Sequence, residues 1–159
     1  MVHLKVLIFG LMLLGIRAEQ VDAGPVSDYI NKLLPYARFT ADSFGVPVSV
    51  ILAIAIVESG AGNSTMAKVM HNHFGLKAGK KWRNCNGMMS RYRCYSTDSA
   101  GVVDFGMYLS RRKFYVHLKG NFDYNAWVKA ISQSGYSTKP VIWRNKILTT
   151  ISKYELFKL

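Results

Sequence analysis

The amino-acid sequence predicts a single, mainly α-helical (α+β) domain that carries a small β-hairpin. Apolar residues recur at helical spacing through residues 26–44, and an almost continuous apolar segment at 48–58 ends in an acidic residue. Residues 77–96 then change character, because an Asn-Gly pair stands between two cysteines, which is typical of a hairpin turn. The chain of 159 residues is long enough for one domain with a substantial core.

Residues 1–23 have the pattern of a secretory signal peptide. Lys5 gives a short basic start, an apolar run of 11 residues follows, and a small-x-small cleavage pattern ends at Ala23. Cleavage after Ala18 and an uncleaved anchor are the alternatives, although the run is short for a membrane span. We therefore predict a domain at 24–159 that is secreted or located in the periplasm or cell envelope.

The chain is strongly basic, with a formal net charge of +12 at pH 7. The charged side chains of the predicted signal peptide cancel one another, so the remaining domain keeps this charge. Such a charge attracts polyanions such as anionic wall polymers, membrane surfaces or nucleic acid, or it serves only solubility. The short basic clusters at 80–83 and 111–113 come without a nucleic-acid-binding motif, so we expect no specific nucleic-acid binding.

The helical segments follow from the spacing of apolar residues. A first amphipathic helix spans 26–44, in which Pro35 marks either a kink or a break into two shorter helices. After a Gly-Val-Pro turn, the helix at about 48–58 is apolar on nearly every side, so we expect it to be the buried central helix. Further helical patterns occur at 99–112, 123–134 and 141–155.

The two cysteines, Cys85 and Cys94, flank the predicted hairpin turn. Export makes a disulfide between them permissible, and closing this short loop would stabilise the fold by roughly 2.5 kcal/mol. A metal site is not expected, because the cysteines lack a nearby histidine pair and because His71 and His73 would lie on different faces of a helix. We also expect no cofactor.

Glu58 is the catalytic candidate that the residues suggest by themselves. It ends the most apolar internal helix, and beyond the signal peptide the only other glutamate is Glu155. Burial and the negative end of the helix both penalise a charged carboxylate, so an acid here should keep its proton near neutral pH. A glycosidase acid needs that state, and the small residues 60–62 leave room for a polymer. The alternative is that Glu58 satisfies backbone groups or pairs with an arginine.

Several motifs occur in an order that is specific to one family. They are Glu58-Ser59-Gly60, the segment from Asn72 to Gly75, Lys77, and Gly135-Tyr136, within the segments 45–82, 92–115 and 123–140. On these motifs the chain resembles the bacterial glucosaminidase family, of the mannosyl-glycoprotein endo-beta-N-acetylglucosaminidase type, over about residues 27–157. That family includes autolysins and flagellar peptidoglycan hydrolases, so the resemblance implies a lysozyme-like fold and a glycan substrate that contains N-acetylglucosamine.

The resemblance also implies a role for each matched position. Glu58 corresponds to the general acid, and Tyr136 corresponds to a tyrosine across the cleft that would orient a water molecule or the N-acetyl group. The positions that would bind substrate or shape the cleft are Asn72, Phe74, Gly75 and Tyr115. Core packing is the alternative role for Phe74 and Tyr115.

One part of the family pattern is missing. Most members carry a second acid in the hairpin, but residues 59–97 contain neither Asp nor Glu. A two-carboxylate mechanism needs a base or nucleophile on the far side of the sugar. Either the 2-acetamido group of the substrate serves as nucleophile, or Asp98 moves into the cleft, or the domain is a weak or inactive wall-binding module. Asp104 matches a family aspartate to which we assign a structural role.

Taken together, these patterns predict a monomeric, secreted peptidoglycan hydrolase. It would cleave the β-1,4 bond after N-acetylglucosamine as an endo-beta-N-acetylglucosaminidase, with Glu58 as the acid. The alternative is a catalytically weak or inactive module of the same fold, which would bind the cell wall and release few or no reducing ends.

Overall fold

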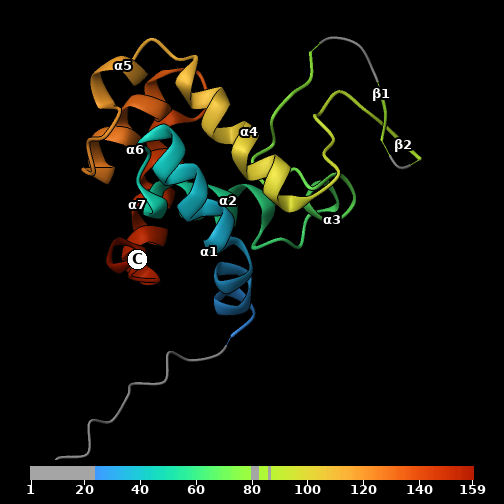
Figure 1. The fold of residues 1–159 in the computed structure, drawn as a ribbon, viewed down its shortest axis with the longest axis horizontal. Coiled ribbons are helices and arrows are strands. Elements are labelled where there is room, and N and C mark those ends of the chain that lie inside the picture. The colour runs from blue at the N-terminus through green and yellow to red at the C-terminus, as the bar shows by residue number, and fades with distance from the viewer. Residues whose placement is uncertain (1–23, 80–82, 86) are drawn as a thin grey trace, which may run out of the picture.

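The computed structural model describes residues 24–79, 83–85 and 87–159 (Figure 1). The predicted signal peptide lies outside these residues. The elements are α1 (Pro25–Phe44), α2 (Val48–Ser59), α3 (Thr65–Met70), β1 (Arg83–Cys85), β2 (Met88–Ser90), α4 (Asp98–Ser110), α5 (Tyr115–Leu118), α6 (Tyr124–Gln133), α7 (Pro140–Lys153) and the 3-10 helix η1 (Leu156–Lys158). The described chain is therefore mostly helical with one small hairpin, which confirms the predicted class.

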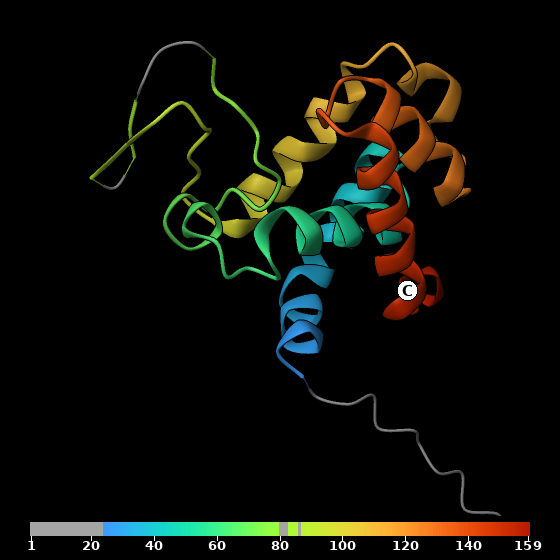
Figure 2. The same ribbon diagram turned by 180° about the vertical axis from the view of Figure 1, so that it is seen from behind.

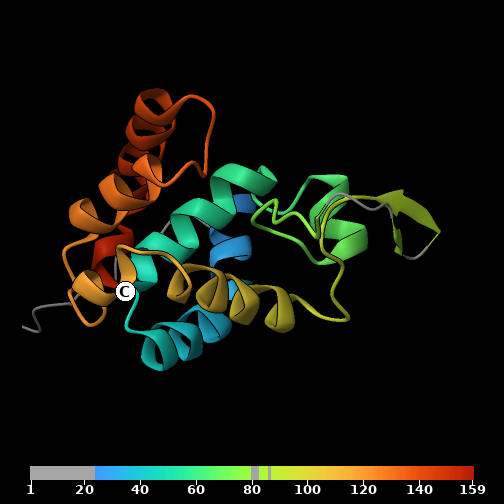
Figure 3. The same cartoon turned by 90° about the horizontal axis from the view of Figure 1, so that it is seen from above.

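Helix α2 lies at the centre of the fold, as its apolar sequence predicted. Every residue from Ser49 to Ile56 is buried, and α2 packs against α1, α6, α7 and η1 (Figure 3). Although α2 is apolar, no helix in the described ranges is both long and apolar enough to cross a membrane. Burial on all sides fixes the axis of α2, and so it fixes the place where its last turn presents Glu58.

Helix α1 is one continuous helix, so the break at Pro35 that the sequence allowed does not occur. Pro35 lies on the exposed face of α1, whereas Leu33 and Ala37 are buried on the face toward α2 and α4. A proline removes one helical hydrogen bond, and on the exposed face water can satisfy the carbonyl that loses its partner. The packing of the buried face then carries the helix through the proline.

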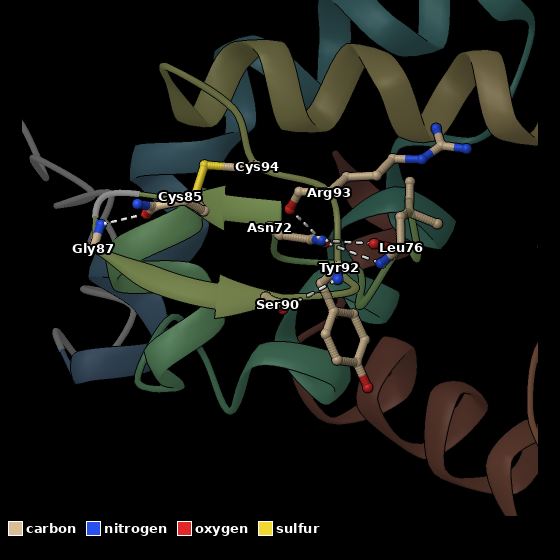
Figure 4. Close-up of a disulfide and its surroundings, with 9 residues drawn as sticks. Asn72, Leu76, Cys85, Gly87, Ser90, Tyr92, Arg93 and Cys94 are labelled. Atoms are coloured by element: carbon tan, nitrogen blue, oxygen red, sulfur yellow. Dashed lines mark hydrogen bonds between the residues drawn. A yellow bond between two sulfur atoms is a disulfide. The ribbon is translucent and has the colours of Figure 1, made fainter. Parts of the chain in front are cut away.

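The hairpin projects from the helical body between α3 and α4 (Figures 1 and 2). Strands β1 and β2 pair antiparallel, with Cys85 opposite Met88, which confirms a hairpin here, although Asn86 of the predicted turn lies outside the described residues. Gly87 has a φ of 84° and donates its N–H to Asn84 Oδ1 at 2.9 Å. Cys85 and Cys94 form a disulfide with a Cα–Cα distance of 5.9 Å, which ties β1 to the segment that leads into α4 (Figure 4).

Two short helices were not predicted from the sequence. Helix α3 has 6 residues and α5 has 4, which is too few for an apolar repeat to be recognised. The start of α3 is set locally, because Ser64 Oγ accepts a hydrogen bond from the backbone N–H of Ala67 at 3.1 Å. Helix α3 leads from the end of α2 toward the hairpin, so it helps to place the hairpin relative to Glu58.

Candidate active site

Glu58 lies partly exposed in the last turn of α2. Its Oε1 atom accepts a hydrogen bond from the indole Nε1 of Trp143, on the first turn of α7, at 2.6 Å. Within the described residues, Oε2 makes no hydrogen bond and Glu58 forms no ion pair, so the predicted alternative of an arginine partner is not observed there. One carboxylate oxygen is therefore fixed, while the other can carry a proton toward a substrate.

The backbone passes close to the open oxygen at Gly75. Gly75 has a φ of +63°, and a Cβ atom built there would lie 4.0 Å from Glu58 Oε2. Glycine adopts this left-handed conformation without steric cost. A longer side chain at this position would begin beside Oε2 and cover it, so the glycine also keeps the oxygen accessible.

Tyr136 lies beside this pair of side chains. Its ring centroid is 5.3 Å from that of Trp143, and its hydroxyl donates to the backbone carbonyl of Phe74 at 2.6 Å. Burial, and then the negative charge of Glu58, raise the pKa of Tyr136 well above its usual value, so the hydroxyl stays protonated. Tyr136 can therefore orient a ligand through its oxygen, but it is not available as a base.

Aromatic side chains of α4 continue from Tyr136. The ring of Tyr108 is edge-on to that of Tyr136, with centroids 5.9 Å apart and planes at 70°. Phe105 lies deeper, with its centroid 6.2 Å from that of Tyr136. Tyr108 is only partly buried, so its ring is available at the surface next to the candidate site.

Asn72 is buried and uses its side chain to hold the backbone. Its Nδ2 atom donates to the carbonyls of Leu76 and Arg93, both at 2.9 Å, and its Oδ1 accepts from the Leu76 N–H at 3.0 Å (Figure 4). These bonds join the segment after α3 to the chain that returns from the hairpin. The geometry supports a role in shaping the cleft rather than in touching a substrate.

Phe74 and Tyr115 occupy packing positions. The Phe74 ring is 2% exposed and stacks on Phe105 with centroids 4.1 Å apart, so it has no surface to offer a substrate, and only its carbonyl faces Tyr136. Tyr115 donates its hydroxyl to the carbonyl of Phe44 at 2.7 Å and lies edge-on to Trp127. These contacts lie at the end of α1 and on α6, so the structure does not bring Tyr115 together with the other predicted site residues.

Comparison with known proteins now places the chain in a family. Residues 34–156 match the family described as mannosyl-glycoprotein endo-beta-N-acetylglucosaminidase. The chain belongs to the glucosaminidase family. This confirms the resemblance that the ordered motifs around Glu58 and Tyr136 had indicated.

Curated relatives carry names from the same group. The chain is 28% identical to the exo-glucosaminidase LytG of Bacillus subtilis, over 88% of this chain and 55% of LytG. It is 25% identical to the peptidoglycan hydrolase FlgJ of Vibrio parahaemolyticus, over 80% of this chain and 47% of FlgJ. The chain thus spans about half the length of the curated relatives that it matches.

Solved structures share the fold of this glucosaminidase-family domain. The truncated glycoside hydrolase domain of Salmonella typhimurium FlgJ superposes with a TM-score of 0.67 at 25% identity, covering 82% of this chain and 97% of that one. The catalytic domain of the autolysin Auto from Listeria monocytogenes gives a TM-score of 0.70 at 21% identity, covering 84% and 86%. With the observed architecture, these likenesses confirm the predicted lysozyme-like fold.

In this glucosaminidase-family domain, Asp98 is held away from a catalytic role. It accepts from Lys32 Nζ at 2.7 Å, from His71 Nδ1 at 2.6 Å and from His73 Nε2 at 2.9 Å. Burial opposes the charged carboxylate, but these hydrogen bonds outweigh it and hold the pKa of Asp98 well below its usual value. Moving Asp98 into the cleft would break all three contacts, so the geometry does not support that option.

The two histidines correct an expectation from the sequence. His71 and His73 do not lie on different faces of a helix, because α3 ends at Met70 and His71 turns the chain with a φ of 51°. Both rings therefore reach Asp98. Among the described residues, no group of three or more His, Cys, Asp or Glu side chains is arranged to hold a metal ion.

The same network reaches the last turn of α2. His73 Nδ1 lies 2.8 Å from the hydroxyl of Tyr29, which lies 2.9 Å from Ser59 Oγ. Ser59 also accepts the N–H of Gly62 at 2.7 Å. Because Ser59 directly follows Glu58, these buried bonds fix the backbone that carries the candidate acid.

Asp104 is also held by hydrogen bonds to neighbouring side chains. Its Oδ2 accepts from Arg93 Nη1 and from the Tyr95 hydroxyl, both at 2.5 Å. It lines a cavity of about 620 Å³ between the hairpin and α4, together with Asn84 and Tyr92. These contacts agree with the structural role predicted for Asp104.

Sequence reasoning missed Trp143. Its spacing of four residues from Ile147 and of eight from Ile151 places it on the buried stripe of α7, where a tryptophan suggests core packing. Its partner Glu58 is 85 residues away in the chain, so only the packing of α7 on α2 reveals the contact.

Proposed function

We propose that this domain is a peptidoglycan hydrolase that cleaves the β-1,4 bond after N-acetylglucosamine, with Glu58 as general acid. The arrangement of Glu58 carries the proposal: Trp143 fixes Oε1 at 2.6 Å, and Oε2 is open beside Gly75. Family membership supports glycosidase chemistry, and relatives named exo-glucosaminidase and peptidoglycan hydrolase support the substrate. The strongly basic surface suits an anionic wall polymer.

The acetamido group of the substrate is the nucleophile in this proposal. Glu58 gives its proton to the glycosidic oxygen as the C1–O bond breaks, and the acetamido carbonyl oxygen bonds to C1. Water then attacks C1, the carbonyl oxygen leaves, and Glu58 takes back a proton. This route needs only one protein acid. It therefore agrees with the absence of Asp and Glu from residues 59–97 and with the ion pairs that hold the carboxylates of Asp98 and Asp104.

Tyr136 is the group that would orient the acetamido nucleophile. Its hydroxyl proton is committed to the carbonyl of Phe74, so its free lone pairs can accept the acetamido N–H. The raised pKa of Tyr136 keeps it neutral, which suits an orienting role rather than a base. The hydroxyl oxygen of Tyr136 and the carboxyl group of Glu58 then act on the same sugar unit.

Internal cleavage is the mode that we propose, in line with the family's description as an endo-acting enzyme. The relative LytG is named an exo-glucosaminidase, so the length of the products decides between the two modes. The substrate lies outside the cytoplasmic membrane, and the predicted signal peptide would deliver the domain to the periplasm, the envelope or the medium.

Product analysis tests the proposal. The purified protein is incubated with peptidoglycan, and soluble fragments are reduced with borohydride and identified by mass spectrometry. Fragments that end in reduced N-acetylglucosamine are expected from the wild type, whereas Glu58→Gln should release none. Glu155→Gln is the matched control, because Glu155 is exposed and pairs only with Lys158 in the described structure. Fragments that end in reduced or anhydro-N-acetylmuramic acid would contradict the assigned bond.

A wall-binding module without turnover is the second candidate. The absence of acidic residues from 59–97 is the observation that favours it. It predicts that wild type and Glu58→Gln sediment equally with insoluble peptidoglycan and that neither releases reducing ends. Release of fragments by the wild type alone would exclude it.

A further inference from the structure

Arg112 carries a charge that the described protein does not neutralise. Its guanidinium lies over the ring of Tyr108, with Cζ 3.8 Å from the ring centroid, and its buried Nε atom has no hydrogen-bond partner. No carboxylate of the described residues lies within ion-pair distance of it. Folded proteins rarely leave a buried donor of a charged group unpaired, because its lost hydration is not replaced. The arrangement points to an anion that comes from outside the chain.

A continuous row of side chains connects Arg112 with the candidate acid. The ring of Tyr108 meets that of Tyr136 at 5.9 Å, Tyr136 meets Trp143 at 5.3 Å, and Trp143 bonds to Glu58 at 2.6 Å. Trp143 is buried, whereas Tyr108 and Tyr136 are partly exposed, so the two tyrosines are the rings of this row that can offer an apolar face and a polar edge to a glycan. A glycan placed at Glu58 and extended along this row brings its substituents to Arg112.

The charges near this row favour the binding of an anion at Arg112. Asp104, one turn before Tyr108 on α4, is paired with Arg93 and Tyr95. Arg111 and Lys113 flank Arg112 and are exposed, so the local charge is positive. An anionic substituent is therefore attracted to this end of the row rather than repelled.

We propose that Arg112 binds a carboxylate of the glycan and thereby selects carboxylate-bearing strands over neutral polymers of N-acetylglucosamine. The inference rests on the proposed glycan-cleaving function and names the chemistry that this site recognises. A planar guanidinium binds a carboxylate through two parallel hydrogen bonds, and Tyr108 holds its plane in place. In peptidoglycan the carboxylate belongs either to the lactyl group of muramic acid or to the stem peptide.

Equilibrium binding separates these possibilities without relying on turnover. The purified protein carries Glu58→Gln, and it is titrated with three soluble glycans: chitin oligosaccharides, amidase-treated strands with free lactyl carboxylates, and strands that keep their peptides. Adding Arg112→Gln should weaken binding to a carboxylate-bearing glycan about tenfold or more and leave chitin binding unchanged. The strand that responds identifies the source of the carboxylate.

Two further variants keep the test decisive. Arg111→Gln makes the same charge change at the neighbouring exposed residue and should leave the preference for anionic strands intact. Arg112→Lys keeps the charge but loses the planar pair of donors, so it should lose part of the preference, and it replaces Arg112→Gln if that variant melts early. Equal loss on chitin with Arg112→Gln, or the same loss with Arg111→Gln, overturns the inference.

Activity assays distinguish a failure of the Arg112 inference from a failure of the proposed glycosidase function. If protein with native Glu58 binds anionic strands selectively through Arg112 but releases no fragments, the glycosidase proposal fails and the inference stands. If it releases fragments while Arg112→Gln binds all three glycans as its parent does, the inference alone fails.

Discussion

The indole N–H of Trp143 donates to Glu58 Oε1 at 2.6 Å, which joins the first turn of α7 to the last turn of α2. The two residues are 85 positions apart, and the bond leaves only Oε2 of the carboxylate free among the described contacts. In the proposed reaction the proton must be on the oxygen that faces the glycan. Trp143 therefore acts as a positioning residue that decides which oxygen delivers it.

Trp143→Phe keeps an aromatic ring in the packing but removes the donor. We expect kcat on peptidoglycan to fall about 10- to 100-fold. Glu58 becomes a carboxylate as it gives up its proton, and a hydrogen bond to a charged group contributes about 1.5–3 kcal/mol. Turbidity loss of a peptidoglycan suspension, checked by counting reducing ends, measures the effect.

Trp127→Phe is the control for this substitution. Trp127 also donates its indole N–H, to the carbonyl of Asn121 at 2.7 Å, but it lies with Phe114 and Tyr115. Trp127→Phe should lower the melting temperature. Any loss of activity should be no larger than the fraction of the protein that is unfolded at the assay temperature. Full activity in Trp143→Phe would remove Trp143 from the proposed mechanism.

Local signals in the sequence predicted part of this site and could not predict the rest. The apolar segment before Glu58 marks a buried helix by composition alone, and the Asn-Gly pair marks the hairpin turn because few residues fit that turn. In contrast, the partner of Glu58 depends on how α7 packs on α2. A tryptophan on a buried stripe gives no sequence signal that its N–H faces a carboxylate.

The histidines show the same limit in another form. Whether His71 and His73 diverge or converge depends on where α3 ends, and a helix of 6 residues gives too little periodicity to locate its end. Their common partner, Asp98, is the first residue of α4. It comes close to the two histidines only because the chain returns from the hairpin to this position in the folded structure. Phe74 and Tyr115 were likewise ambiguous, because an aromatic side chain suits both a core and a cleft wall.

Gly75→Asn tests whether the open side of Glu58 is needed. Asparagine tolerates the left-handed conformation at a φ of +63°, but its side chain starts beside Oε2. We expect a small loss of stability, about 1 kcal/mol or less, and a loss of kcat/KM of about tenfold or more. Gly120→Asn is the control, since Gly120 has a φ of +78° and nothing within 4 Å of an added Cβ. Equal activity of the two variants would show that access at Gly75 is not limiting.

Acid should destabilise the fold through His73 and Asp98. Burial lowers the pKa of His73 from 6.5, despite the opposing effect of Asp98, so the unfolded chain binds a proton that the folded chain does not. The free energy of unfolding should therefore decrease as pH falls below about 6.5, and decrease further below about 4, as Asp98 becomes protonated in the unfolded chain. Lys32 and His71 contact the same carboxylate.

Urea unfolding at pH 7.5, 6.5 and 5.5 measures this effect. His73→Gln should be less stable at pH 7.5 and should lose most of the pH dependence between pH 7.5 and 5.5. His117→Gln serves as the control, because His117 is exposed and is not part of the Asp98 network. An unchanged pH slope in His73→Gln would mean that other groups cause the acid sensitivity.

The disulfide between Cys85 and Cys94 should stabilise the hairpin rather than the helical body. It closes a loop with a sequence separation of 9, for which loop entropy predicts roughly 2–3 kcal/mol. In the Cys85→Ser/Cys94→Ser variant we expect protease cleavage within 77–96 at a concentration that leaves the wild type intact, while the protein keeps its helical circular dichroism. Dithiothreitol should make the wild type equally sensitive and should not change the variant. If the reductant lowers the helical signal of the wild type as well, the hairpin and the helical body unfold together.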